Sequence, residues 1–87
     1  MTTERIILTA PNGMHARPAG ELVKLVKSFA PAKVTLRTAV KEANAASMLG
    51  VLGLGIKNGA EIDVCVDGGD EAAILASVCE FLLGIKD

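Results

Sequence analysis

The residue of this sequence best suited to covalent chemistry is His15, its single histidine. An unperturbed imidazole has a pKa of about 6.5, so at pH 7 it is largely neutral and one nitrogen is a nucleophile without a separate base. Phosphate on such a nitrogen leaves more easily than phosphate in an ester, which suits a group that is passed on. Arg17 lies close by in sequence and offers a fork of N–H donors that fits phosphate oxygens. Together they predict a histidine that holds a phosphoryl group briefly.

The residues around His15 are those expected at the start of a helix. Residues 11–13, Pro-Asn-Gly, predict a tight loop, and the apolar spacing after them predicts a helix from about Ala16. The first backbone N–H groups of a helix have no intrahelical acceptor, and the helix dipole favours negative charge there. We therefore expect the backbone N–H groups of Ala16 and Arg17 to bind phosphate oxygens. Pro18 fits the same site because its missing N–H costs little in the first turn.

Chemistry beyond phosphate transfer is not indicated. No nucleophile, base and orienting group are spaced as a hydrolytic set, so we expect no turnover by this chain alone. Cys65 and Cys79 have neither the spacing of a metal site nor that of a redox pair, which predicts ordinary apolar cysteines, no metal ligands and no cofactor. A histidine before a helix is also common as a cap or a surface residue, so spacing alone leaves a structural role for His15 open.

The elements that must position His15 are expected in the order strand, helix, strand, strand, helix, strand and helix. The expected strands cover residues 5–9, 33–38, 40–44 and 61–67, and the expected helices run from Ala16 to before Pro31, after Ser47 and after Asp70. This βαββαβα order, with half-buried strands, predicts an α+β fold in which helices cover one side of an antiparallel sheet. The chain is short, so we expect one domain over residues 1–87.

Residues 61–67 show the strand alternation most clearly and set the expected orientation of the sheet. One set of side chains is apolar and is expected to face the helices: Ile62, Val64 and Val66. The other set is expected to face water: Asp63, Cys65 and Asp67.

Composition and charge exclude several classes of partner. The formal net charge is −1 and the only aromatic residues are Phe29 and Phe81, so the chain offers nucleic acid neither a basic field nor stacking platforms. The N-terminus lacks a signal-peptide pattern, and the longest apolar run, residues 48–56, contains three glycines and is too short to span a bilayer. We expect a cytoplasmic monomer that inserts into no membrane.

Residues 13–19, Gly-Met-His-Ala-Arg-Pro-Ala, resemble the active-site signature of the histidine-containing phosphocarrier (HPr) family of the bacterial phosphoenolpyruvate-dependent sugar phosphotransferase system. The similarity extends to residues 9–13, 52–55 with 58–59, and 69–71. The resemblance implies an open-faced β-sandwich with four antiparallel strands and three helices on one face. It also implies that His15 accepts a phosphoryl group on Nδ1, the pros nitrogen, from Enzyme I and donates it to IIA domains of sugar permeases.

Ser47 occupies the place where this family often has a serine that an ATP-dependent kinase, HPr kinase/phosphorylase, phosphorylates in some bacteria. Phosphate there would add charge at a second helix start and weaken docking near His15. This sequence has Ala46 where a lysine is frequent, which departs from the pattern that the kinase meets. The alternative interpretation of Ser47 is a plain N-cap, typically worth about 1 kcal/mol.

A partner-binding face is expected beside His15. Its apolar members lie near the two predicted helix starts and are Met14, Met48, Leu49 and Leu52. Methionine is flexible and suits a face that must fit several partners. Lys24 and Lys27 share a side of the first predicted helix and are expected to steer acidic partners. The alternatives are core packing for the apolar residues and a merely solvated helix side for the lysines.

Three functions fit these observations. The first is a sugar-transport phosphocarrier, and the second is a regulatory carrier of the nitrogen branch with the same His15 chemistry but other acceptors. The third is a binding module in which His15 is structural and is never phosphorylated. Phosphorylation by Enzyme I separates the third function from the other two, and the preferred acceptor separates the first from the second.

Overall fold

Seven elements follow one another in the predicted βαββαβα order in a computed structural model, which describes residues 1–85. They are β1 (Thr2–Ile7), α1 (Ala16–Lys27), β2 (Lys33–Arg37), β3 (Glu42–Asn44), α2 (Met48–Gly53), β4 (Glu61–Asp67) and α3 (Glu71–Leu83). Within the described residues, no helix is long and apolar enough to cross a membrane.

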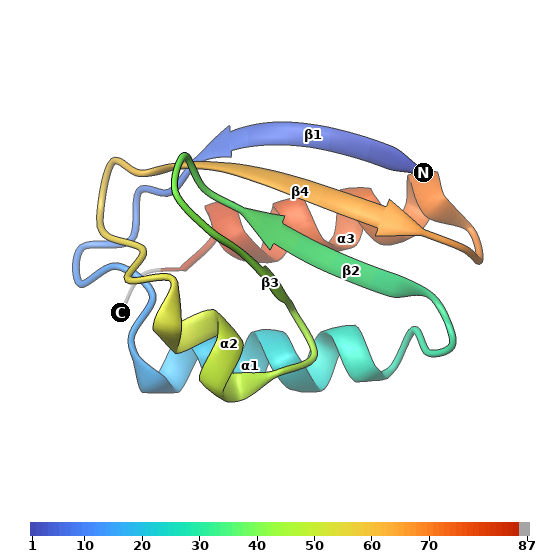
Figure 1. The fold of residues 1–87 in the computed structure, drawn as a ribbon, viewed down its shortest axis with the longest axis horizontal. Helices are drawn as coiled ribbons and strands as arrows, with labels where there is room; N and C mark the ends of the chain where they lie inside the picture. Colours follow the sequence, from blue (N-terminus) through green and yellow to red (C-terminus); the bar gives the residue numbers. More distant parts are fainter. Residues whose placement is uncertain (86–87) are drawn as a thin grey trace.

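The four strands form one antiparallel sheet in the order β1-β4-β2-β3. In its register Val64 of β4 lies between Glu4 of β1 and Leu36 of β2. Because side chains alternate along a strand, Ile62, Val64 and Val66 all point to one face, and all three are fully buried. The three helices cover that face and leave the other open (Figure 1). The predicted open-faced β-sandwich is confirmed.

The core lies between the sheet and the helices, and each helix contributes its apolar side. α1 buries Leu22 and Val26, α2 buries Val51, and α3 buries Val78 and Leu82. A fully buried aliphatic side chain of this size stabilises a fold by roughly 1.5–3 kcal/mol relative to an exposed one. This single continuous core fixes how α1 sits on the sheet, and therefore where its first turn lies.

Cys65 is buried, at 3% exposure, although the strand alternation predicted that it would face water. The register does place it on the open face, directly between Thr3 of β1 and Thr35 of β2. Cross-strand neighbours lie close enough for two β-branched side chains to cover the small thiol between them. Strand periodicity therefore gave the correct face and the wrong accessibility for this residue.

Two strand boundaries also differ from the sequence-based expectation. β1 begins at Thr2 and ends at Ile7, earlier than residues 5–9, because the whole of it pairs with β4. β3 is only three residues long, whereas residues 40–44 were expected in the strand. The N–H of Thr38 donates a 2.7 Å hydrogen bond to the carbonyl of Lys41, which closes a turn there and leaves Val40 exposed.

The start of α3 is tied to the start of β1 by a cluster of polar contacts. Asp70 is the N-cap, as predicted, and its side chain accepts a hydrogen bond from the N–H of Ala73. Glu71 accepts from the N–H of Gly68 and from the Thr2 hydroxyl, both at 2.9 Å, and its carboxylate lies 3.2 Å from the chain's amino terminus. The Gly68 hydrogen bond is the main cause that lowers the pKa of Glu71.

Candidate functional site

His15 is the N-cap of α1. Its backbone is extended (φ −91°, ψ −174°), its ring makes no capping hydrogen bond, and its carbonyl accepts the N–H of Ala19 at 3.0 Å. The helix begins at Ala16, as predicted. The N–H groups of Ala16 and Arg17 therefore precede the first intrahelical hydrogen bond, at the positive end of the helix dipole. An anion carried by His15 would lie beside these donors.

The imidazole of His15 is half-buried, and its two nitrogens differ in surroundings. Nε2 is enclosed by protein and has no hydrogen-bond partner within residues 1–85. The exposed part of the ring is therefore the part away from Nε2. A partner can approach the ring from that side.

Pro18 and Met14 flank the site but are both buried. Pro18 supplies no N–H and is buried, so it shapes the first turn of α1, and its part in phosphate binding stays a prediction. Met14 was expected on the partner-binding face, yet it is only 5% exposed. The residue before an N-cap often packs against the fourth helical residue, here Ala19, which is fully buried in the same core. The burial of Met14 in this core corrects its expected place on the partner-binding face.

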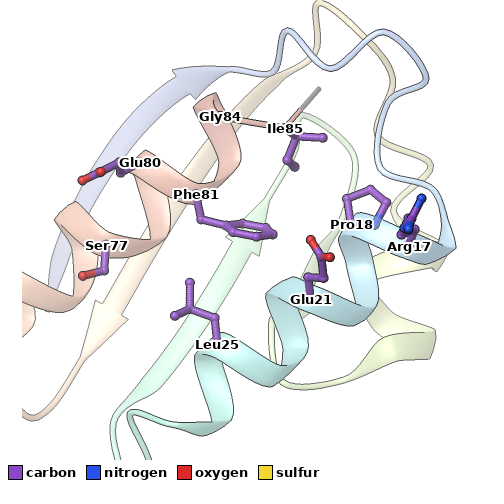
Figure 2. A pocket seen from close by; sticks show the side chains of 9 residues that line it. All are labelled: Arg17, Pro18, Glu21, Leu25, Ser77, Glu80, Phe81, Gly84 and Ile85. Atoms are coloured by element: carbon purple, nitrogen blue, oxygen red, sulfur yellow. The ribbon is translucent and has the colours of Figure 1, made fainter. Parts of the chain in front are cut away.

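Arg17 is exposed and lines a groove of about 780 Å³ between α1 and α3. Figure 2 shows Arg17 at the end of the groove near the start of α1, and the ring of Phe81 reaching from α3 toward α1 beside Glu21. The groove is lined by Arg17, Pro18, Glu21, Leu25, Ser77, Glu80, Phe81, Gly84 and Ile85. Sequence reasoning did not place α3 beside Arg17, because the groove joins residues that are far apart in the chain.

Comparison with known proteins agrees with this geometry. The family model described as the HPr component phosphorylation site of the phosphotransferase system (PTS) matches residues 2–83, nearly the whole chain. This chain belongs to the HPr family. Phosphocarrier protein HPr of Lysinibacillus sphaericus is 44% identical over 71 residues, which are 82% of this chain and 80% of that protein.

Solved HPr structures share the fold. The histidine-containing phosphocarrier protein of Mycoplasma superimposes with a TM-score of 0.87 at 29% identity, covering 94% of this chain and 92% of the other. HPr from Bacillus anthracis gives the same TM-score at 27% identity, covering 93% and 95%. Membership of this phosphocarrier family agrees with a chain that carries a group and does not convert a substrate of its own.

Other residues expected to meet partners lie on α1 and α2 of this HPr-family chain. Leu49 is 85% exposed, Leu52 is 36% exposed, and Met48 is partly buried. Val51 and Leu54, by contrast, belong to the core. These three exposed or half-exposed side chains form what we call the apolar patch: Met48, Leu49 and Leu52. Lys24 and Lys27 are exposed in the last turn of α1, where positive charge also stabilises the helix.

Ser47 is the N-cap of α2, and its hydroxyl accepts a 3.2 Å hydrogen bond from the N–H of Gly50. The cap predicted from the sequence is thus formed. A regulatory role for this HPr-family serine stays a prediction.

A second hollow, of about 470 Å³, lies at one end of the open sheet face of this HPr-family chain. Each arginine that lines it is paired with a carboxylate, Arg5 with Asp63 of the same hollow and Arg37 with Glu42 beside it. The Nε of Arg5 donates to Asp63 at 2.8 Å and that of Arg37 to Glu42 at 3.3 Å, so positive and negative side chains alternate across the four strands. The Arg5 hydrogen bond lowers the pKa of Asp63. Exposed pairs of this kind contribute little to stability, and they leave no unbalanced field in the hollow.

Proposed function

We propose that His15 accepts a phosphoryl group from phospho-Enzyme I and donates it to IIA domains of sugar permeases. The observation that carries the proposal is the placement of a half-exposed imidazole at the N-cap of α1, directly before the N–H groups of Ala16 and Arg17. The family to which the chain belongs supports the same conclusion.

The acceptor atom in this proposal is Nδ1. Burial of Nε2 supports this choice, because an incoming phosphorus can reach only an exposed lone pair. The lone pair of Nδ1 forms the new N–P bond while the bond between phosphorus and the donor atom of Enzyme I breaks, and the proton of the neutral ring stays on Nε2. In the second step an atom of a IIA domain attacks the phosphorus and the N–P bond breaks. This returns His15 to its unphosphorylated form.

Positioning and charge stabilisation do most of the work in phosphoryl transfer, since negative charge is spread over the three equatorial oxygens. The N–H groups of Ala16 and Arg17 and the Arg17 guanidinium are the donors proposed to hold those oxygens. None of them reacts with water. The phosphoryl group therefore waits for a partner nucleophile and is not hydrolysed by the chain itself.

Partners are proposed to cover the start of α1 and the apolar patch together, with Lys24 and Lys27 steering acidic surfaces. We propose that the chain acts as a monomer in the cytoplasm, because a handover between larger proteins needs a small accessible surface. Sedimentation of the purified chain at assay concentration measures the oligomeric state.

Phosphorylation of Ser47 by HPr kinase/phosphorylase is proposed as a regulatory step in hosts that have this kinase. The phosphate would replace the Oγ cap at a helix beside the apolar patch and would add two negative charges at most at pH 7. Mass spectrometry of the chain after incubation with the kinase and ATP tests this step, with Ser47→Ala as the unmodifiable control.

The main proposal is tested by incubating the purified chain with phosphoenolpyruvate and Enzyme I. We expect a phosphate that is labile in acid and stable in base, absent from His15→Ala, and bound to Nδ1 by heteronuclear NMR. An unmodified wild-type chain would leave only the binding-module alternative. Transfer rates to a sugar IIA domain and to a nitrogen-branch IIA domain then separate sugar transport from the nitrogen-branch alternative.

A further inference from the structure

The loop that carries His15 rests directly on the segment between α2 and β4. Gly13 has a positive φ of 67°, and a Cβ at this position would lie 2.6 Å from the carbonyl oxygen of Ile56 and 2.9 Å from the Cα of Lys57. Both atoms belong to the backbone, so neither moves aside as the tip of a side chain would. Only a residue without a side chain permits this approach.

The next residue uses the same carbonyl. The N–H of Met14 donates a 2.9 Å hydrogen bond to the oxygen of Ile56, and the N–H of Gly13 donates to the carbonyl of Ala10 at 3.0 Å. The side chains of Met14 and Ile56 are both 5% exposed. The two residues before His15 are therefore held by backbone contact, by a hydrogen bond and by burial.

We propose that Gly13 is a positioning residue for phosphoryl transfer, because its close contact with Ile56 and Lys57 fixes the His15 imidazole at the start of α1. This inference rests on the proposed function. His15 is separated from the contact by Met14 alone, so a shift of the loop moves the ring relative to the N–H groups of Ala16 and Arg17. Such a shift lowers the rate of phosphoryl transfer more than it weakens docking of the partner, because transfer depends on the exact position of the reacting atoms.

The chain contains a matched control glycine. Gly55 also has a positive φ, of 62°, but a Cβ there would meet nothing within 4 Å. Gly13→Ala and Gly55→Ala therefore impose the same kind of backbone strain, and only the first collides with the Ile56 carbonyl. A difference between the two variants isolates the contact from the strain.

The test is steady-state phosphorylation of wild type and both variants by Enzyme I and phosphoenolpyruvate, with rates expressed per folded molecule from circular dichroism at the assay temperature. For Gly13→Ala we expect kcat to fall by about 10- to 100-fold. Its KM should stay near the wild-type value, because the exposed residues that meet Enzyme I are unchanged. Gly55→Ala should keep the wild-type kcat.

A measurement on the wild-type chain tests the inference without a variant. NMR relaxation should give order parameters near 0.85 for the backbone of Gly13 and Met14 and a rigid His15 ring. Order parameters below about 0.6 there would overturn the inference. Equal kcat for Gly13→Ala and Gly55→Ala, with wild type active, would also overturn it, whereas a wild-type chain that is never phosphorylated would overturn the proposed function instead.

Discussion

Met48 lies over Gly20, so that a Cβ on Gly20 would be 3.8 Å from the terminal methyl of Met48. A Cβ there would make an ordinary van der Waals contact, so α2 packs close beside the helix that His15 caps. Because Met48 points toward α1, its neighbour Leu49 is directed to solvent and is 85% exposed. An apolar side chain this exposed contributes little to the core and is available to a partner.

We predict that Leu49→Ser raises the KM for Enzyme I or for a IIA domain with little change in kcat or in the free energy of unfolding. Loss of a buried interface contact of this size costs on the order of 1–2 kcal/mol, which is about a 5- to 30-fold change in KM. Val40→Ser is the matched control, since Val40 is 83% exposed but lies in the β2–β3 turn. Equal KM values for the two variants would remove Leu49 from the partner-binding face.

Arg17→Gln is predicted to lower kcat for phosphorylation of His15 by about 10- to 100-fold, because a charge-assisted hydrogen bond is worth about 1.5–3 kcal/mol. Lys24→Gln removes the same charge from the same helix but farther from its N-terminus. It should change only KM, and that change should shrink as salt screens the attraction. Rates at low and high ionic strength check both variants. Similar kcat values for the two would contradict the proposed role of the guanidinium.

Glu71→Gln is predicted to lower the free energy of unfolding at pH 7 and to have a smaller effect in acid. The pKa of Glu71 in the folded chain lies below its ordinary value of 4.5, chiefly because of the Gly68 N–H. The stabilisation by the Glu71 carboxylate is therefore complete above about pH 4.5. It is lost as the pH falls through the pKa of Glu71 in the folded chain, and there the stabilities of wild type and variant converge. Urea unfolding between pH 7 and pH 3 measures this.

Glu80→Gln is the control for that series. Glu80 is exposed on the same helix, and within residues 1–85 its side chain makes no hydrogen bond or ion pair. A pH profile for Glu80→Gln as altered as that of Glu71→Gln would mean that helix charge in general, and not the Gly68 and Thr2 contacts, is responsible.

Cys79 is predicted to react slowly with a thiol reagent in the folded chain. Burial is the main cause that raises the pKa of its thiol to about 11, and nearby Glu4 adds to the effect, so almost no thiolate is present at pH 8. Cys65 is also buried and free. A colorimetric thiol assay should therefore show both thiols reacting only after urea is added. Fast reaction of the native chain would show that one cysteine is accessible, and Cys79→Ser would identify which.

Local patterns in the sequence predicted the elements and the helix start at His15, because capping residues, turn residues and apolar spacing act over a few positions. The alternation of residues 61–67 gave the buried set Ile62, Val64 and Val66 correctly. The His-Ala-Arg-Pro motif likewise indicated a phosphate site at a helix N-terminus, where the structure places His15.

What the sequence could not predict depends on contacts between distant segments. The sequence placed Met14 on the partner-binding face, and only the structure shows that it is buried in the core. It placed Cys65 in water, and only the structure shows Thr3 and Thr35 on either side of it. The close approach of Gly13 to Ile56 and the groove beside Arg17 join residues from separate elements. Gly13 itself was the only local sign of its close approach to Ile56.

The central position of β4 determines when the sheet can form during synthesis. Arg5 and Asp63 are directly paired although they are 58 positions apart, and β2 also pairs with β4. Before β4 has left the ribosome, only the short β2–β3 hairpin has its partner available. Much of the native contact set is therefore non-local, which slows folding relative to a helical bundle of similar size. The nascent chain carries an unpaired, partly apolar β1 until the last strand emerges, and that interval is when association with other nascent chains or with a chaperone competes with folding.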